Sequence, residues 1–539
     1  MARWIPNRAR CRLGPIALGA VLLLAGAFLG VTLAACGGGD DSATTATGGS
    51  GTGVLRVASW LTVTTWDPRE AFGEEPIFLS NIYEPLLYTS PPGSDQEYTP
   101  CLAESWEVSD DGLTWTFHLR KGVTFHDGTP FNAEAVKYSV EATRKLDLGA
   151  AYIWSPVKQI NVVDEYTVEM VCSSPAPLER VASSMYGAWI FSPSTKGKDA
   201  DWWNMPNEAG TGPYRLVSYT PNDQTVFERY EDYWGGWKDG QPKRVVMKYV
   251  AESATQRQML EAGEVDFADS ISRDALPAMK NNANVDIVDI KSLQNVVVML
   301  NTKRKPLDDV KVRQALSYAV NYEDILAVAT NGLGQVARGP IPYTLYPHDP
   351  NTPQYTHDPA KAKQMLSEAG YADGFTLLMT YASDDAFGSK LAPVLKENFA
   401  EVGVTLDLQP LLFEQQAAKA QGPAEDRQDL FEIIWWPDFP DGYSNLYSLF
   451  YSGEVWNAAY WSNPEYDDMI DTAFSEEPVN PENAQRLYNE AQKLVVDEAL
   501  ALYLFDFDSF YVKLPTLTLT DMALNPNYAS VLYFYHTSL

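Results

Sequence analysis

The stretch WEVSDDGLTWTFHLRKGVTFHDGTPFNAEAVKYSVE, residues 106–141, decides the fold of this 539-residue chain. In its middle, the apolar residues Trp115, Phe117 and Leu119 alternate with polar residues. Side chains of a strand point alternately to its two faces, so this period of two predicts a strand with one buried face. The strand is expected to end at Arg120.

Turn residues and a helix signal follow this strand. Lys121-Gly122 and Asp127-Gly128-Thr129-Pro130 carry turn chemistry, because Gly tolerates positive φ and Pro fixes φ at the first turn position. Asn132 is expected to cap a helix over Ala133–Arg144 by accepting a hydrogen bond from a free backbone N–H. The stretch therefore predicts strand, turn, short strand, turn and helix.

The same stretch resembles a known signature. The order DG-x-T-W-T-F-x-LRKGV-x-FHDG-x-P-F-x-AE-x-V, at residues 111–136, resembles that of the family 5 extracellular solute-binding proteins, the peptide- and nickel-binding receptors of ABC importers. GTGPY at 210–214 and PLDDVKVRQAL at 306–316 resemble further family segments.

The resemblance implies an α/β, two-lobed periplasmic-binding-protein-like (Venus-flytrap) fold with an extra subdomain in the first lobe. It implies a monomer that captures a small ligand, most often peptide-like, in a cleft between the lobes. The ligand is then delivered unaltered to a membrane permease that works with ATPase subunits.

The amino-acid composition limits the kinds of molecule that the chain is expected to bind. The chain has 71 acidic and 40 basic residues, a formal charge of −31, which argues against nucleic acid because phosphates would be repelled. Aromatic residues make up 12% of the chain, and such rings serve both the core and the walls of organic-ligand sites.

The N-terminal segment reads as an export signal. Four arginines precede the apolar run Ile16–Val31, and Leu33-Ala34-Ala35-Cys36 follows, in the order of a secretory signal. The L-A-A-C order resembles a bacterial lipobox, which implies lipidation of Cys36 and a protein held outside the cytoplasm by a lipid anchor alone. Residues 37–53, GGGDDSATTATGGSGTG, have nothing with which to build a core and predict a flexible linker.

The rest of the chain predicts two α/β lobes. A β-α-β step is expected over 245–267, and strand-like runs at 376–380, 405–411 and 431–435 alternate with helices. The expected segments are a signal peptide at 1–35, a lipoprotein linker at 36–53, lobe I at 54–83 and 209–293, its additional subdomain at 84–208, lobe II at 294–505, and a return to lobe I at 506–539.

Three later helices begin with the same signal. Asp358-Pro359, Asn463-Pro464 and Asn480-Pro481 each offer a capping side chain followed by a proline whose fixed φ suits the first helical position.

Cys101 and Cys172 both fall in the additional subdomain. An exported protein permits a disulfide there, and two buried free thiols are the equal alternative.

The candidate ligand-binding residues gather after the strand predicted at 431–435. The segment from Trp435 to Asn445 resembles the W-x-x-D-Y-x-x-P segment of peptide-binding members, in which the Asp pairs with the ligand α-amino group. The resemblance gives that role to Asp438, since a carboxylate holds a cation through a charge-assisted hydrogen bond. The further candidates for the cleft walls are Trp60, Thr62, Trp435, Trp436 and Tyr443.

One position departs from the family. Some oligopeptide-binding members carry an Arg six residues before that Asp, and here the position is Glu432, with no matching substitute at Arg427. A peptide carboxylate thus lacks an evident partner, which leaves a cationic or neutral polar ligand open.

The sequence gives little support for an enzymatic function. The five histidines form no i, i+4 pair, no G-x-S-x-G or nucleotide loop is present, and no cofactor or metal is expected. Two alternatives stay open beside the peptide receptor. One is a binding protein for oligosaccharides or another organic solute, and the other is an extracytoplasmic hydrolase.

Overall fold

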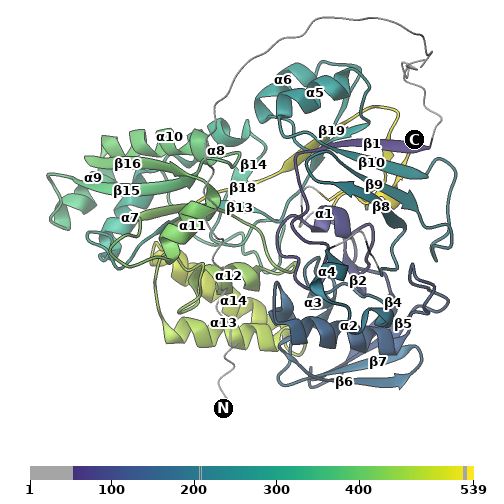
Figure 1. Ribbon diagram of the computed structural model, residues 1–539. Coiled ribbons are helices and arrows are strands. Elements are labelled where there is room, and N and C mark those ends of the chain that lie inside the picture. Colours follow the sequence, from purple (N-terminus) through teal and green to yellow (C-terminus); the bar gives the residue numbers. More distant parts are fainter. Residues whose placement is uncertain (1–52, 205–206, 208, 526–527, 529–530) are drawn as a thin grey trace, which may run out of the picture.

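Two β-sheets, each with its own helices, form the two lobes of the computed structural model (Figure 1). The structure describes residues 53–204, 207, 209–525, 528 and 531–539. The predicted signal peptide, the lipidation site Cys36 and all of the predicted linker except Gly53 lie outside the described residues. Within them, no helix has both the length and the apolar character that crossing a membrane requires.

The sheet of lobe I has seven strands in the order β12-β19-β11-β1-β10-β9-β8. Its strands are β1 (Val54–Ser59), β8 (Tyr214–Thr220), β9 (Gln224–Arg229), β10 (Arg244–Tyr249), β11 (Phe267–Ala268), β12 (Asp286–Ile290) and β19 (Ser509–Lys513). The predicted β-α-β step is confirmed: α5 (Ser253–Glu261) joins β10 to β11, and both of these strands flank β1 in parallel register. Leu260 of α5 packs in one apolar cluster with Ala58 and Val512 of the sheet.

The sheet of lobe II has six strands in the order β14-β18-β13-β17-β15-β16. Its strands are β13 (Asn295–Leu300), β14 (Gly334–Val336), β15 (Phe375–Ala382), β16 (Val404–Leu411), β17 (Leu430–Trp435) and β18 (Ala501–Phe507). Its helices are α7 (Val310–Ala319), α8 (Tyr322–Thr330), α9 (Pro359–Glu368), α10 (Gly388–Glu401), α11 (Phe413–Gln421), α12 (Gly442–Phe450), α13 (Pro464–Glu476) and α14 (Pro481–Asp497).

Both faces of the lobe II sheet are buried. Val296 and Val298 of β13 pack in the cluster that includes α7, α8, α9 and α10, whereas Val297 and Met299 belong to the cluster that includes α12, α13 and α14. Alternate residues of one strand therefore serve two different cores, which explains why β13 reads as an unbroken apolar run.

The strand and the helix predicted for the opening stretch are confirmed, whereas the short strand between them is only an isolated bridge between Thr124 and Pro130. The strand belongs to a four-stranded antiparallel sheet of order β4-β5-β7-β6. These strands are β4 (Ala103–Val108), β5 (Thr114–Leu119), β6 (Val157–Asp164) and β7 (Thr167–Cys172). Trp115, Phe117 and Leu119 are buried, and the Asn132 side chain accepts a hydrogen bond from the Ala135 N–H (3.1 Å) at the start of α2 (Ala133–Leu146).

The remaining helices and strands are short. They are α1 (Pro76–Leu79), β2 (Leu87–Thr89), β3 (Tyr98–Pro100), α3 (Leu178–Ala182), α4 (Ala200–Trp203), α6 (Leu276–Met279), β20 (Thr518–Leu519) and β21 (Thr537–Ser538). Cys101 and Cys172 do not form a disulfide, because both are free and buried. The alternative of two buried free thiols is therefore the one that holds, and burial raises the pKa of the Cys172 thiol to about 12, which makes it unreactive.

The chain crosses between the two large sheets at two neighbouring places. The segment 291–294 joins β12 to β13, and Asp508 joins β18 to β19. The Lys291 ammonium lies 2.6 Å from one Asp508 carboxylate oxygen, and the Tyr343 hydroxyl donates to the other (2.8 Å). Two short, linked crossings between rigid sheets form the geometry of a hinge.

Candidate functional site

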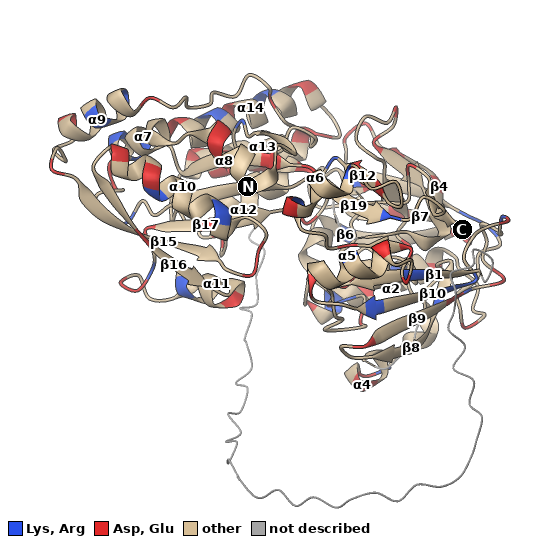
Figure 2. Ribbon diagram, turned by 90° about the horizontal axis from the view of Figure 1, so that it is seen from above, with Lys and Arg blue, Asp and Glu red and all other residues tan. Residues whose placement is uncertain are grey.

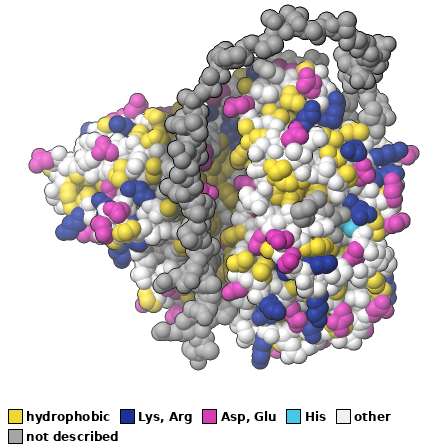
Figure 3. Space-filling view, in the orientation of Figure 1, with side chains coloured by type: hydrophobic (Ala, Val, Ile, Leu, Met, Phe, Trp, Pro, Cys, Tyr) yellow, Lys and Arg dark blue, Asp and Glu magenta, His cyan; other side chains and the backbone are white. Residues whose placement is uncertain are grey.

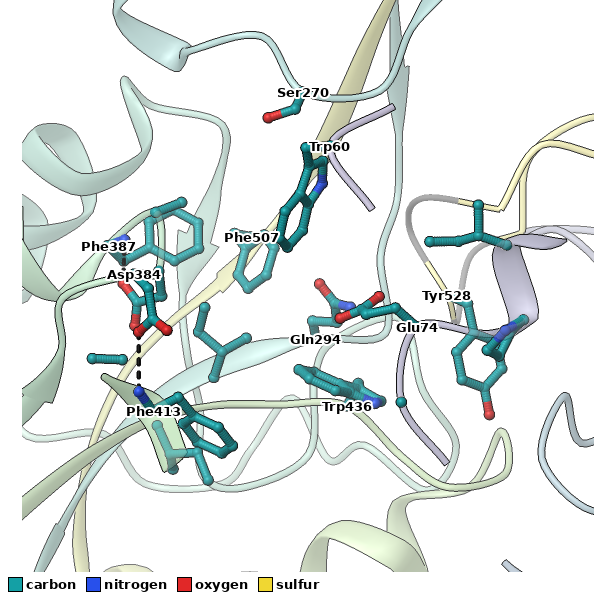
Figure 4. Close-up of a pocket in the computed structure, with 18 of the residues that line it drawn as sticks. Trp60, Glu74, Ser270, Gln294, Asp384, Phe387, Phe413, Trp436, Phe507 and Tyr528 are labelled. Carbon is teal, nitrogen blue, oxygen red and sulfur yellow. Dashed lines mark hydrogen bonds between the residues drawn. The ribbon is translucent and has the colours of Figure 1, made fainter. Parts of the chain in front are cut away.

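A cavity of about 690 Å³ lies between the lobes, beside these crossings. Its volume is within the range of about 300–1,000 Å³ that small-ligand sites occupy. Gln294 of one crossing and Phe507, next to the other, both line it, together with Glu74 and Trp60 of lobe I and Phe413 of lobe II (Figure 4). A movement at the hinge would thus change the cavity directly.

Three acidic side chains form the lobe II wall of the cavity. Asp384 and Asp385 lie in the loop between β15 and α10, and Glu432 lies on β17. Asp384 accepts a hydrogen bond from the Phe413 N–H (3.1 Å), and Asp385 accepts from the Phe387 and Gly388 N–H groups (2.7 and 2.6 Å) at the start of α10. Backbone donors therefore hold both loop carboxylates in place.

Of these three acids, Glu432 is fully buried. One carboxyl oxygen, Oε2, accepts from the Ala382 N–H (3.3 Å), and the other, Oε1, has no N–H or hydroxyl donor among the described residues. The Glu432 carboxyl group also hydrogen-bonds that of Asp385, which requires a proton between the two acids. Burial raises the pKa of Glu432 well above its ordinary value, and the charge of Asp385 raises it further.

The lobe I wall is acidic as well. Glu74, in the turn before α1, is exposed to solvent in the cavity, and the surrounding protein raises its pKa to about 7. The charges of Glu75 and Asp269 act in the same direction. A carboxyl group with this pKa changes charge near neutral pH.

Arg273 is the one basic side chain among the described residues that line the cavity. Its guanidinium donates to the Asp508 carbonyl (2.8 Å) and lies 5.3 Å from the ring centre of Phe387. Burial lowers its pKa to about 10, so the group is charged at neutral pH, and its Nη1 has no partner among the described residues. Arg273 thus contacts the hinge and an aromatic ring of the wall, and one of its N–H donors has no partner among the described residues.

Aromatic rings form much of the remaining wall. They are Trp60, Tyr186, Phe387, Phe413, Trp436, Phe507 and Tyr528. Figure 3 shows hydrophobic side chains in the hollow between the lobes, and the colouring of the ribbon in Figure 2 shows that acidic residues occur on both lobes. Apolar rings with a few convergent charged groups are the usual composition of an organic-ligand site.

Two of the predicted wall residues line the cavity. These are Trp60, which is 43% exposed, and Trp436, both drawn in Figure 4. Trp435 is buried against Trp456 (ring centres 6.2 Å apart), and Tyr443 is buried and stacks on Phe474 (4.3 Å).

The other two predicted residues lie outside the cavity lining. Thr62 borders a separate pocket of about 10 Å³. Asp438 accepts a hydrogen bond from the Tyr152 hydroxyl of the additional subdomain, and its carbonyl accepts from Ser184 (2.8 Å) and Tyr528 (3.2 Å). Ligand contact by these residues therefore stays a prediction.

Sequence reasoning missed Glu74, Arg273, Asp384 and Asp385 as site residues. They come from segments far apart in the chain, and none stands in a motif. Glu432 was singled out as a departure from the family pattern, and this was the one signal that pointed to the acidic wall. Within the described residues, no group of three His, Cys, Asp or Glu side chains is arranged to hold a metal ion.

Comparison with known proteins gives a family match. The sequence profile described as "Bacterial extracellular solute-binding proteins, family 5 Middle" matches residues 97–457. The probable D,D-dipeptide-binding periplasmic protein DdpA of Escherichia coli K12 is 31% identical over 75% of this chain and 78% of its own length. The glutathione-binding protein GsiB of Pectobacterium atrosepticum is 30% identical over 76% of this chain and 80% of its own.

Solved structures share the two-lobed fold. DppA from Helicobacter pylori, in complex with the peptide STSA, superposes with a TM-score of 0.75 at 24% identity, over 90% of this chain and 98% of its own. The ABC transporter substrate-binding protein CtaP of Listeria monocytogenes superposes with a TM-score of 0.81 at 20% identity, over 90% and 99%. At these identities the likeness establishes the architecture.

Proposed function

We propose a ligand class for this chain, which belongs to the family 5 bacterial extracellular solute-binding proteins: it captures a peptide-like molecule with a free amino group in the cavity between its lobes. Proteins of this family are transport receptors and not enzymes. They bind small ligands or peptides outside the cytoplasm and deliver them to the permease of an ABC importer.

The observation that carries the proposal is the charge of the cavity. Four carboxyl groups, those of Glu74, Asp384, Asp385 and Glu432, face one guanidinium, that of Arg273. A ligand ammonium group gains charge-assisted hydrogen bonds from such walls, and the aromatic rings supply apolar contact and cation–π attraction. Two relatives whose names state dipeptide and glutathione binding support a peptide-like ligand.

The Arg273 guanidinium is the proposed partner of a ligand carboxylate. Arg273 lines the cavity, and its buried Nη1 has no partner among the described residues. A zwitterionic peptide would then place its carboxylate at lobe I, beside the hinge, and would bridge the two lobes. Contacts that exist only when the lobes are together favour the closed form, which a permease can recognise.

Asp438 remains a proposed partner of the ligand amine. In this structure its carboxylate accepts from Tyr152, so the proposal requires the ligand ammonium to replace or join that hydroxyl group. Unchanged affinity of Asp438→Asn for a peptide ligand would remove Asp438 from the site.

The cellular setting is proposed from the sequence. The L-A-A-C order supports lipidation of Cys36, and with it attachment to the membrane by a lipid anchor, as a monomer. Mass spectrometry of the membrane fraction would detect a diacylglyceryl group on Cys36, and its absence in a Cys36→Ser variant is the control.

Native mass spectrometry of gently purified protein tests the ligand class. We expect masses of co-purifying peptides, and isothermal titration calorimetry with short peptides should then give saturable 1:1 binding. Co-purifying sugars, with no peptide binding, would replace the peptide proposal by the oligosaccharide alternative.

A further inference from the structure

We propose that Asp384, Asp385 and Glu432 form a subsite for an organic cation, a primary ammonium or a guanidinium group, on the lobe II wall of the cavity. The inference rests on the proposed function and deepens it, because it names where a charged group of the captured molecule binds. The cation can come from the α-amine of a peptide or from a basic side chain, and the two sources share the same chemistry.

The fold brings the three acids together at the carboxyl ends of two strands. β15 and β17 run parallel, with Thr380 opposite Phe431, so Glu432 lies beside the end of β15 at Ala382. Asp384 and Asp385 follow directly in the loop that leads to α10. The crevice outside the carboxyl ends of parallel strands is where open α/β sheets bind their ligands.

Glu432 supplies the observation that points to a ligand. Its side chain is fully buried, it lines the cavity, and its Oε1 has no N–H or hydroxyl donor among the described residues. Its carboxyl group is next to that of Asp385, and the two acids hydrogen-bond each other only while they hold a proton between them. A cationic donor brought by the ligand would replace that proton and donate to both carboxylates. Ammonium and guanidinium groups carry several N–H donors and a compensating charge.

Asp385 makes the subsite selective for a cation over a neutral donor. Two N–H groups at the start of α10 hold its carboxylate in place, and a helix N-terminus favours the negative form. Two adjacent carboxyl groups cannot both ionise in a buried site without a large cost, so Glu432 retains a proton when the cavity holds no cation. An incoming cation can take the place of that proton, which leaves Glu432 for the solvent.

Among the described residues that line the cavity, no basic side chain pairs with these acids. The other ionisable groups that line the cavity are Glu74, which adds negative charge, Arg273, and the phenols Tyr186 and Tyr528. Arg273 donates to the Asp508 carbonyl on the hinge. Lys390 of α10, the helix that follows the acidic loop, pairs with Asp274 (2.9 Å).

Calorimetric titration of the purified protein with four forms of Ala-Lys tests the subsite. The forms are the free dipeptide and its derivatives acetylated at the α-amine, at the ε-amine and at both. We expect double acetylation to weaken binding by about tenfold or more relative to the tightest charged form, as the loss of a charge-assisted contact requires. The two singly acetylated forms identify which amine enters the subsite.

Glu432→Gln is the decisive variant, because it keeps the size of the side chain and removes its charge. The variant should bind the doubly acetylated peptide as the native protein does and should lose the preference for charged forms. Glu401→Gln, which changes an exposed acid of α10 outside the cavity, should retain that preference. A Glu432→Gln protein that keeps the full preference would overturn the subsite.

Proton release offers a second measurement, made on a Glu74→Gln protein so that Glu74, whose pKa is also near 7, does not contribute. Binding of the charged peptide in two buffers of different ionisation enthalpy should reveal a proton released near pH 7, and the doubly acetylated peptide should release fewer. Equal release by both forms contradicts the subsite.

A diamine separates this inference from the proposed function. If peptides bind with no dependence on charge, the subsite fails and peptide capture stands. If cadaverine binds in a Glu432-dependent way and no peptide binds, the subsite stands and peptide capture fails. If neither binds, both fail.

Discussion

Glu74 is the residue whose ionisation should set the pH dependence of binding. Its pKa is raised to about 7, first by the loss of hydration and then by the charges of Glu75 and Asp269. Below that pH the group is neutral and attracts a cation weakly. The affinity for a cationic peptide should therefore rise severalfold between pH 6 and pH 8, and Glu74→Gln should flatten the rise, as measured by calorimetry at each pH.

The raised pKa of Glu74 should also make the stability of the folded protein depend on pH. The unfolded chain ionises Glu74 near its ordinary value of 4.5, whereas the folded protein does so at about 7. Between these values the folded state binds more protons, so its stability falls as pH rises, and Glu74→Gln should reduce that fall. A pH profile of affinity or stability that is identical in the variant would show that Glu74 does not titrate in the cavity.

Arg273 should select for a ligand carboxylate. Replacement by Gln removes the charge and the open Nη1 donor, so a peptide with a free C-terminus should bind about tenfold more weakly. The matched peptide amide, which has no carboxylate, should bind both proteins alike. Because the Arg273 side chain also packs against Phe387 and donates to the hinge, equal losses for the two peptides would instead assign it a purely structural role.

The wall residues show why a sequence gives the site only in part. Trp435 and Trp436 are neighbours at the end of β17, and successive side chains there point in opposite directions, one into the core and one into the cavity. Sequence alone does not say which face is which, so both were predicted. Asp384 and Glu74 line the same cavity only because the two lobes are assembled around it.

At the scale of single elements, capping side chains should contribute measurably. The Asn463 side chain accepts from the Glu465 and Tyr466 N–H groups (3.0 and 3.4 Å) at the start of α13. Asn463→Ala should lower the free energy of unfolding by about 1 kcal/mol in urea titrations, whereas Asn463→Ser keeps an acceptor and should cost less. Equal stabilities of the two variants would show that the cap is not contributing.

Elements were predicted well because their signals are local. The caps at Asp358, Asn463 and Asn480 are confirmed, each accepting a hydrogen bond in the first turn of its helix. The short helix α1 ends at Leu79. The following residues turn so that the Asn81 and Ile82 carbonyls can accept from the 212–214 segment, a long-range contact that no local pattern encodes.

At the scale of the whole molecule, a buried cluster of charges joins α3 to the α12 and α13 helices of lobe II. Arg180 of α3 lies 2.8 Å from carboxylate oxygens of both Asp441 and Glu477, and all three are buried. Burial and mutual repulsion raise the pKa of Asp441 well above its ordinary value, and Arg180 opposes this shift. The arginine is thus needed to hold two acids in the interface.

Arg180→Met should therefore be strongly destabilising. Removing one partner leaves buried acids uncompensated, which costs about 3–5 kcal/mol in the free energy of unfolding. The matched control is Arg244→Met, whose partner Glu228 lies at the surface, with an expected cost of about 0–1 kcal/mol. Similar losses in the two variants, measured by urea denaturation, would contradict a special role for the buried cluster.

Capture between two hinged lobes is the central claim, and small-angle X-ray scattering with and without a saturating peptide tests it most directly. The cavity lies between the lobes, and Gln294 and Phe507 beside the two crossings both line it, so ligand contact and lobe closure are mechanically linked. The account predicts a smaller radius of gyration for the complex, with a maximum dimension that shortens in step with occupancy. A peptide that binds with no change in the scattering curve would contradict it.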